Sequence, residues 1–206
     1  MEGEVTSYTI VLSPPGMDRM FLHNPGANDT FTSRDINFDL VSRAKLFHLG
    51  YPPLMRKLYE NEGREMAEIF RKAKDSGVTT SLDFTLPDPE SPSGKVNWPK
   101  ILEKTLPYVD IFLPSAEEIL FMLRKDKFFQ LEKKGDILAQ LKGEDLSSLS
   151  GEMLNYGVKI AAIKCGYRGF YVKTASEDKL SQIGFAGPGD RGNWSGRELW
   201  EPTYHV

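Results

Sequence analysis

Short hydrophobic runs alternate with longer amphipathic segments along most of the chain. Four of the runs have the length and the apolar content of strands, and 78–84 is rich in β-branched residues. These predicted strands are 45–50, 78–84, 109–113 and 158–164. The first reads as buried, and the small and branched residues of the last suggest burial on both faces. Because helical segments separate the four, the pattern predicts an α/β fold with right-handed crossovers and a mostly parallel sheet.

The amphipathic segments predict the helices that connect these strands. The longest is expected from Leu54 to Ser76, after Pro52-Pro53, with Gly77 at the position of a C-terminal cap. The other predicted helices are 38–43, 98–106, 115–123, one or two short helices within 125–149, and a helix near 151–156.

The two ends of the chain have a different pattern from the middle. Residues 7–13 and 19–23 are β-rich runs separated by Pro14–Asp18, which predicts an antiparallel hairpin. Near the other end, the pattern predicts antiparallel strands at 169–173 and 180–185, a loop at 187–192 and a last strand at 200–206.

Composition excludes several functional classes. Charged residues make up 27% of the chain, with both signs interspersed and a net charge of −3, so no broad basic face for nucleic acid is predicted. The chain begins Met1-Glu2-Gly3-Glu4 and has no apolar run near the roughly 20 residues that span a bilayer, so we expect no membrane association and a cytoplasmic location. Cys165 is the sole cysteine, which excludes an internal disulfide.

The segment Asp110 to Glu118 places a strand end beside a helix start. The Ser115 side chain is spaced to accept a hydrogen bond from the Glu118 N–H, while the Glu118 carboxylate is spaced to accept one from the Ser115 N–H. This pattern is a capping box, and local structure alone explains it. Alternatively, the positive helix end and the same carboxylate organise phosphate or a metal ion at the strand terminus.

Other strand ends carry polar residues that a parallel sheet would gather at one edge, the usual ligand crevice. They include His48, Asp83 and Lys164. Asp83 is either an ordinary cap or a ligand for a metal or hydroxyl, and Lys164 is either a phosphate contact or a solvated edge lysine. The Gly166–Gly169 turn permits close approach to a ligand, or simply joins two strands.

Three further features carry weaker functional signals. The chain has no G-x-x-x-x-G-K-[ST] phosphate loop. Gly187–Asp190 is interpreted as a surface turn, because the residues that follow do not form an amphipathic helix. Cys165 has no histidine close in sequence and is interpreted as a buried thiol rather than a nucleophile.

Taken in order, these segments resemble the ribokinase-like (PfkB) carbohydrate kinase family. The resemblance covers most of the chain and is carried by the order and spacing of the hairpin, Gly26-Ala27-Asn28, 45–50, 81–84, 114–118 and 163–172. It implies one truncated domain over residues 1–206, with 7–30 as a lid-like hairpin and 45–206 as the α/β core. It also implies transfer of the γ-phosphate of ATP to a sugar hydroxyl, with Mg²⁺ as cofactor.

The resemblance assigns several residues to the nucleotide side of the site. Ser115 falls where the family usually has the asparagine of an N-x-x-E motif, and Glu118 falls on the glutamate that helps to organise Mg²⁺ and phosphate. Lys164, Gly166 and Gly169 fall along the strand and turn on the same side. Serine keeps a hydroxyl but lacks the amide, so this motif departs from the family pattern at one of its two positions.

Two residues are assigned to the substrate side. Asn28 lies in the loop after the hairpin, and Asp83 matches the aspartate of a D-x-N-x-R pattern. Thr85 and Pro87 replace the asparagine and arginine of that pattern.

The resemblance also implies missing parts. The chain is expected to be an internal portion that lacks the N-terminal sugar-binding segment and the C-terminal G-A-G-D motif with its catalytic base. Asp190 lies too early to take that role, so no catalytic residue is assigned. We therefore expect an ATP-dependent sugar kinase that is weak or inactive as this chain. The alternative is a non-catalytic sugar-binding, nucleotide-binding or assembly module, and exposed edges predict self-association.

Overall fold

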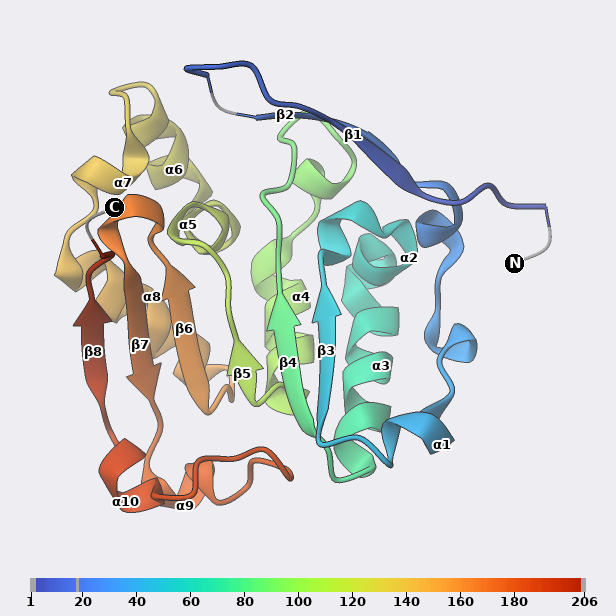
Figure 1. Ribbon diagram of the computed structural model, residues 1–206, viewed down its shortest axis with the longest axis vertical. Coiled ribbons are helices and arrows are strands. Elements are labelled where there is room, and N and C mark those ends of the chain that lie inside the picture. Colours follow the sequence, from blue (N-terminus) through green and yellow to red (C-terminus); the bar gives the residue numbers. More distant parts are fainter. Residues whose placement is uncertain (1–2, 18, 205–206) are drawn as a thin grey trace.

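The computed structural model describes residues 3–17 and 19–204. One sheet has the strand order β3-β4-β5-β6-β7-β8, and β1 and β2 pair separately as a hairpin (Figure 1). The strands are Tyr8–Leu12 (β1), Met20–Asn24 (β2), Leu46–Gly50 (β3), Thr79–Asp83 (β4), Ile111–Phe112 (β5), Ile160–Lys164 (β6), Phe170–Thr174 (β7) and Glu198–Glu201 (β8). Strands β3 to β6 are parallel, whereas β7 and β8 are antiparallel to their neighbours. The predicted α/β class, with a mostly parallel sheet and a separate hairpin, is confirmed.

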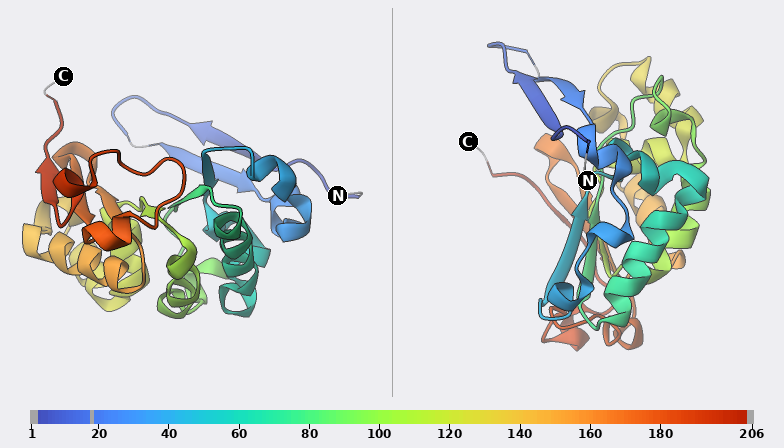
Figure 2. Two further views of the ribbon diagram at one scale, coloured as in Figure 1. Left: turned by 90° about the horizontal axis from the view of Figure 1, so that it is seen from below. Right: turned by 90° about the vertical axis from the view of Figure 1, so that its right-hand side faces the viewer.

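The helices vary in length from single turns to more than three turns. They are Phe38–Val41 (α1), Arg56–Tyr59 (α2), Arg64–Asp75 (α3), Trp98–Thr105 (α4), Ala116–Leu123 (α5), Lys125–Glu132 (α6), Ile137–Gln140 (α7), Gly143–Asn155 (α8), Glu177–Leu180 (α9) and Arg191–Trp194 (α10). Helices α3, α4 and α8 lie on the same side of the sheet (Figure 2). Within residues 3–17 and 19–204, no helix has both the length and the apolar character needed to cross a bilayer.

The main core forms between the sheet and these helices. Strand register places Leu82 opposite Phe112, and Phe112 opposite Ala161, so these side chains share one face of the sheet. All three are fully buried, and they belong to one cluster with Phe70 of α3 and Leu102 of α4. The opposite face carries the alternate residues, which include Asp83 and Lys164 at the strand ends.

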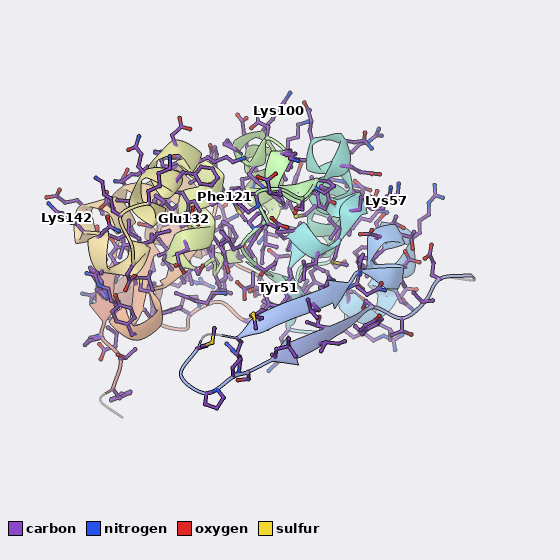
Figure 3. The ribbon with its side chains drawn as sticks, turned by 90° about the horizontal axis from the view of Figure 1, so that it is seen from above. Tyr51, Lys57, Lys100, Phe121, Glu132 and Lys142 are labelled. Carbon is purple, nitrogen blue, oxygen red and sulfur yellow. The ribbon has the colours of Figure 1, made fainter. Side chains whose placement is uncertain are left out.

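The hairpin lies over the carboxyl ends of β3 and β4 (Figures 1 and 3). It forms the predicted antiparallel pair, and its register joins Tyr8 with Asn24 and Leu12 with Met20. The predicted connecting loop includes Asp18, which lies outside the described residues. The chain then returns past its own start, where the Ala27 N–H donates to the Val5 carbonyl over 2.8 Å.

The predicted helix from Leu54 to Ser76 is wrong in its first half. The segment is divided into α2 and α3 by a turn at 60–63, where Asn61, Glu62 and Gly63 all have positive φ. A Cβ on Gly63 would lie 2.5 Å from Cγ2 of Ile101, so close packing against α4 fixes this turn. Gly77 does follow the helix in the left-handed conformation, as predicted.

Strand β3 is not the buried strand that the sequence suggested. It forms an edge of the sheet, and its Leu46 is 45% exposed. By contrast, Ala161, Ala162 and Ile163 of β6 are all buried, which confirms burial on both faces there.

The predicted strand at 180–185 is also wrong. Helix α9 ends at Leu180, and the following segment crosses the amino end of β4, where the Ala186 N–H donates to Thr79 Oγ1 over 2.8 Å. Buried Leu180 and Ile183 are three residues apart, which fits a turn of helix better than an alternating strand.

Smaller differences concern element boundaries. Helix α8 begins at Gly143, well before the predicted start near Gly151, and β5 has only two residues. The last strand covers Glu198–Glu201, and part of its predicted range, 205–206, lies outside the described residues.

Candidate functional site

The carboxyl edge of the parallel strands gathers most of the predicted site residues. Strand β4 ends at Asp83, β6 ends at Lys164, and Ser115 lies between them at the start of α5. The Lys164 N–H donates to the Pro114 carbonyl over 2.9 Å, and Ser115 pairs with Lys164 as an isolated parallel bridge. The predicted convergence of Asp83, Ser115, Glu118 and Lys164 is therefore what the fold produces.

The capping box at the start of α5 forms in both directions. The Glu118 N–H donates to Ser115 Oγ over 3.2 Å, and the Ser115 N–H donates to Glu118 Oε2 over 2.7 Å. The local interpretation of this motif is thus sufficient to explain its geometry. Glu118 retains its second carboxylate oxygen for another partner.

Glu118 is an unusual carboxyl group for a capping residue. It is only 9% exposed. Burial raises the pKa of Glu118 to about 7, and nearby Asp83 adds to the rise, whereas the Ser115 hydrogen bond and Lys164 oppose it. A carboxyl group with such a pKa near neutrality is typical of functional sites, although capping networks also produce it.

Asp83 and Lys164 bind each other across the edge. Their side chains project from the same face of β4 and β6, and Lys164 Nζ forms an ion pair with Asp83 Oδ1. Asp83 Oδ1 also accepts from the Phe84 N–H over 2.7 Å. The sequence left Asp83 as a cap or ligand and Lys164 as a phosphate contact or a solvated lysine, and their mutual pairing was not among those alternatives.

The turn that follows β6 requires its two predicted glycines. Gly166 has φ +52° and Gly169 has φ +97°, both in the region that favours glycine. A Cβ on Gly169 would lie 1.9 Å from the Glu201 carbonyl oxygen, so β7 and β8 approach too closely for any side chain there. The role of this turn in joining strands is therefore sufficient to explain both glycines.

Asn28 lies at a different part of the same edge. It lines a pocket of about 320 Å³ between the hairpin and the end of β3, together with Gly50 and Tyr51. Gly50 pairs with Asp83, and the Tyr51 N–H donates to the Asp83 carbonyl over 3.3 Å. The pocket that Asn28 lines thus adjoins Gly50, the strand partner of Asp83, and Tyr51 lies beside the hairpin (Figure 3).

Sequence reasoning missed His23 as a member of this pocket. His23 belongs to β2, lines the pocket and contacts Thr9. The sequence placed His48 among the polar strand-end residues, and it gave no role to His23 or His205, which lie too far apart in sequence for a local metal-ligand motif. His48 contacts Ser81 instead, with 3.1 Å between Nδ1 and Oγ, and His205 lies outside the described residues.

Asp190 is the N-cap of α10, and α10 lies below the strands in Figure 1, at the end of the sheet opposite the carboxyl ends of β3 and β4. Its Oδ1 accepts from the Asn193 N–H over 3.0 Å and caps α10, a helix of four residues. The predicted turn at Gly187–Asp190 lies in the irregular segment that precedes this helix. Cys165 is buried, and burial raises the pKa of its thiol, which fits an unreactive side chain.

The donor set at the carboxyl edge fits Mg²⁺ only as part of a phosphate complex. Among the described residues, no group of three or more His, Cys, Asp or Glu side chains is placed to hold a metal ion. Asp83 and Glu118 do provide carboxylate oxygens near the helix start. Mg²⁺ is usually held by one or two carboxylates together with substrate phosphates, which is the arrangement that these residues allow.

Known proteins are similar to this chain in sequence and in fold. It is 32% identical over 105 residues to a probable chloroplastic fructokinase-6 of Arabidopsis thaliana, a match that covers 51% of this chain and 26% of that protein. Fructokinase-2 of Oryza sativa subsp. japonica is 31% identical over 109 residues, covering 52% of this chain and 31% of the relative. No protein-family model matches.

The solved structures extend the likeness over nearly the whole chain. A ribokinase from Thermotoga maritima aligns with a TM-score of 0.55 and 17% identity, covering 98% of this chain and 50% of that one. The chain has a ribokinase-like fold. A putative ribokinase II from E. coli, in complex with ATP and Mg²⁺, aligns with a TM-score of 0.57 and 18% identity, covering 99% of this chain and 52% of that one.

These findings confirm the resemblance to the ribokinase-like (PfkB) carbohydrate kinases. The ribokinase-like chain spans about half the length of the solved structures, and its sequence matches cover less than a third of each of the two curated fructokinases.

Proposed function

We propose that the ribokinase-like chain binds a sugar and Mg²⁺–ATP at the carboxyl edge of its sheet, as a sugar kinase does, with weak or no phosphoryl transfer. The observation that supports this most directly is the convergence of Asp83, Glu118 and Lys164 at one edge, with the Asn28 pocket beside them. The names of the fructokinase and ribokinase relatives point to the same substrate class.

The nucleotide side of the proposed site is the start of α5. Its first N–H groups and the positive helix end favour phosphate oxygens, and Lys164 supplies a cation within the same edge. The Glu118 carboxyl lies one helical turn inside, where Mg²⁺ carried by the phosphates would favour its ionised form. Mg²⁺, when bound, would neutralise phosphate charge and polarise the transferred group.

The expected weakness of phosphoryl transfer follows from the lack, among the described residues, of a carboxylate at this edge that is available to act as a base. A sugar kinase needs a base to accept the hydroxyl proton. At this edge Asp83 is paired with Lys164 and Glu118 completes the capping box, while Asp190 caps α10 at the opposite end of the sheet. The same observation supports the alternative of a binding module that keeps its ligands without reacting them.

Two measurements test the proposal together. Calorimetric titration with Mg²⁺–ATP is expected to show binding, and an assay for ADP release with D-fructose or D-ribose is expected to show little turnover. Absence of heat with Mg²⁺–ATP would contradict a nucleotide site. Rapid sugar-dependent ADP release would instead contradict the weak-transfer part of the proposal.

A substitution sharpens the nucleotide test. Ser115→Asn restores the asparagine of the family pattern and keeps a good N-cap, so the helix start is preserved. We expect tighter Mg²⁺–ATP binding than in the original chain. Ser115→Ala is the matched variant that removes the cap, and equal affinities for all three chains would place the nucleotide elsewhere.

We also propose that the chain self-associates. The outer sides of β3 and β8 are strand edges among the described elements, and the hairpin exposes large apolar residues such as Phe21 and Leu22. Light scattering over a concentration series is expected to show a mass above that of one chain. A constant monomer mass at high concentration would rule this out.

A further inference from the structure

We propose that His23 is a specificity-determining residue that binds a hydroxyl group of a neutral, polyhydroxylated small molecule. The site is the pocket between the hairpin and the end of β3. The inference adds a sugar-binding residue to the proposed function, and it rests on that function for any phosphoryl transfer to the bound ligand. Its evidence is separate, because it comes from an unpartnered atom and from the lining of the pocket.

The imidazole of His23 is anchored on one side only. Its Nδ1 lies 2.8 Å from Thr9 Oγ1, across the hairpin from which both residues project. Its Nε2 is buried and has no hydrogen-bond partner in the protein. A buried polar atom without a partner is destabilising and rare in folded proteins, so its retention beside a pocket points to a ligand.

The chemistry of neutral histidine selects a hydroxyl group as that partner. If the Nδ1–H donates to Thr9, Nε2 is a bare acceptor and needs a donor. If Thr9 donates to Nδ1, Nε2 carries the hydrogen and needs an acceptor. A ligand hydroxyl satisfies either arrangement because it both donates and accepts, whereas an ammonium group only donates and a carboxylate only accepts.

The pocket also suits a small neutral ligand. Its volume of about 320 Å³ is at the lower end of the roughly 300–1,000 Å³ typical of ligand sites. Among the described residues that line it there is no charged side chain, while Asn28, Thr9 and Ser7 offer polar atoms. Tyr51 adds an aromatic side chain from a strained position, with φ +66°.

A second buried polar atom without a hydrogen-bond partner provides a comparison for His23. Among the described residues, buried side-chain polar atoms without a partner are His23 Nε2 and Thr105 Oγ1. Thr105 is fully buried at the end of α4, in the core under the helices. His23 differs because it lines a pocket, so the two residues form a matched pair for experiment.

The test compares sugar binding by four chains. Calorimetric titration with D-fructose and D-ribose is made on the original chain, His23→Leu, His23→Gln and Thr105→Val. At least one sugar is expected to bind, with affinity about threefold to tenfold weaker in His23→Leu, which loses one hydrogen bond. His23→Gln is expected to recover part of that loss, and Thr105→Val to leave affinity unchanged.

A spectroscopic readout keeps the test decisive if a variant folds poorly. In the original chain labelled with ¹⁵N-histidine, the sugar is expected to shift the Nε2 resonance of His23 more than that of His48. Binding without such a shift, or equal affinities for the original chain and His23→Leu, would overturn the inference. If neither D-fructose nor D-ribose binds to the original chain, the inference is overturned as well.

Titration with Mg²⁺–ATP separates this inference from the proposed function. Nucleotide binding with no His23-dependent sugar binding refutes the inference and leaves the nucleotide site standing. Sugar binding that depends on His23, without nucleotide binding, supports the inference and refutes the kinase-like assignment. D-gluconate and D-glucosamine serve as charged comparators, and tighter binding of either than of both neutral sugars would refute the neutral ligand class.

Discussion

Glu118→Gln is expected to stabilise the protein at alkaline pH and to have little effect in mild acid. In the folded chain burial raises the pKa of Glu118 to about 7, against an ordinary value of 4.5. The folded state therefore holds this proton more tightly than the unfolded state does. Lys164 on β6 and Asp83 on β4 are the charged groups that face the carboxyl, and their effects oppose each other.

The sign and size of the effect follow from linkage. Below about pH 4.5 the carboxyl is protonated in both states, so its contribution to stability is fully present. As pH rises towards 7, only the unfolded state ionises freely, and each unit lowers the free energy of unfolding by about 1.4 kcal/mol. The whole loss is about 3 kcal/mol, and it levels off above the folded pKa.

Glutamine removes this loss while keeping the cap, because its amide oxygen can still accept from the Ser115 N–H. The free energy of unfolding, measured by urea denaturation, should exceed that of the original chain by roughly 2.5 kcal/mol more at pH 8 than at pH 5. Glu132→Gln, an exposed glutamate on α6, reports the effect of the same substitution at the surface. If both variants show the same difference between the two pH values, the argument from burial is refuted.

Three further changes test other parts of the structure. Gly169→Ala is expected to lower the free energy of unfolding, measured by urea titration, by more than about 1 kcal/mol, because the new methyl group meets the Glu201 carbonyl at a positive φ. Gly189→Ala is the control, since open space surrounds Gly189, and it should have little effect in the same titration. Lys164→Met removes the ion pair with a partly exposed Asp83, so thermal denaturation should show a loss of stability of at most about 1 kcal/mol. This loss should shrink in high salt, which screens a solvent-exposed pair. A larger loss that does not depend on salt would contradict the assignment of a solvent-screened pair. Thr105→Val replaces a buried hydroxyl without a hydrogen-bond partner by a methyl group, and it is expected to raise the free energy of unfolding by about 1 kcal/mol. A clear loss of stability would show that the hydroxyl has a partner.

Local signals explain which parts of the fold could be predicted. The β-branched run before Asp83 and the S-x-x-E spacing at Ser115 are short-range patterns, and both formed as predicted. The break at 60–63 could not be predicted in the same way. Asn61 and Gly63 adopt the left-handed region readily, but Glu62 between them does not. The turn also brings Gly63 against Ile101 of α4, a contact between residues far apart in the sequence.

In the candidate site as well, some features could be predicted from the sequence and others depend on tertiary contacts. The sequence indicated which residues would reach the carboxyl edge, because parallel strands share a direction. It could not indicate which of them bind each other, since Asp83 and Lys164 are 81 positions apart and meet only through the order of strands in the sheet. The unpartnered nitrogen of His23 has no sequence signal, because it follows from atomic positions in the hairpin and the pocket.

The two-residue strand β5 changes how the centre of the sheet is held together. Beyond its two residues, backbone bonds continue the ladder on both sides, from the Leu113 N–H to the Leu82 carbonyl and from the Lys164 N–H to the Pro114 carbonyl. The Asp83–Lys164 pair adds a side-chain tie between two strands that are not neighbours. Such a tie weakens as ionic strength rises, whereas backbone hydrogen bonds do not. High salt is therefore expected to weaken the side-chain tie at the carboxyl edge and to leave the backbone ladder around β5 in place.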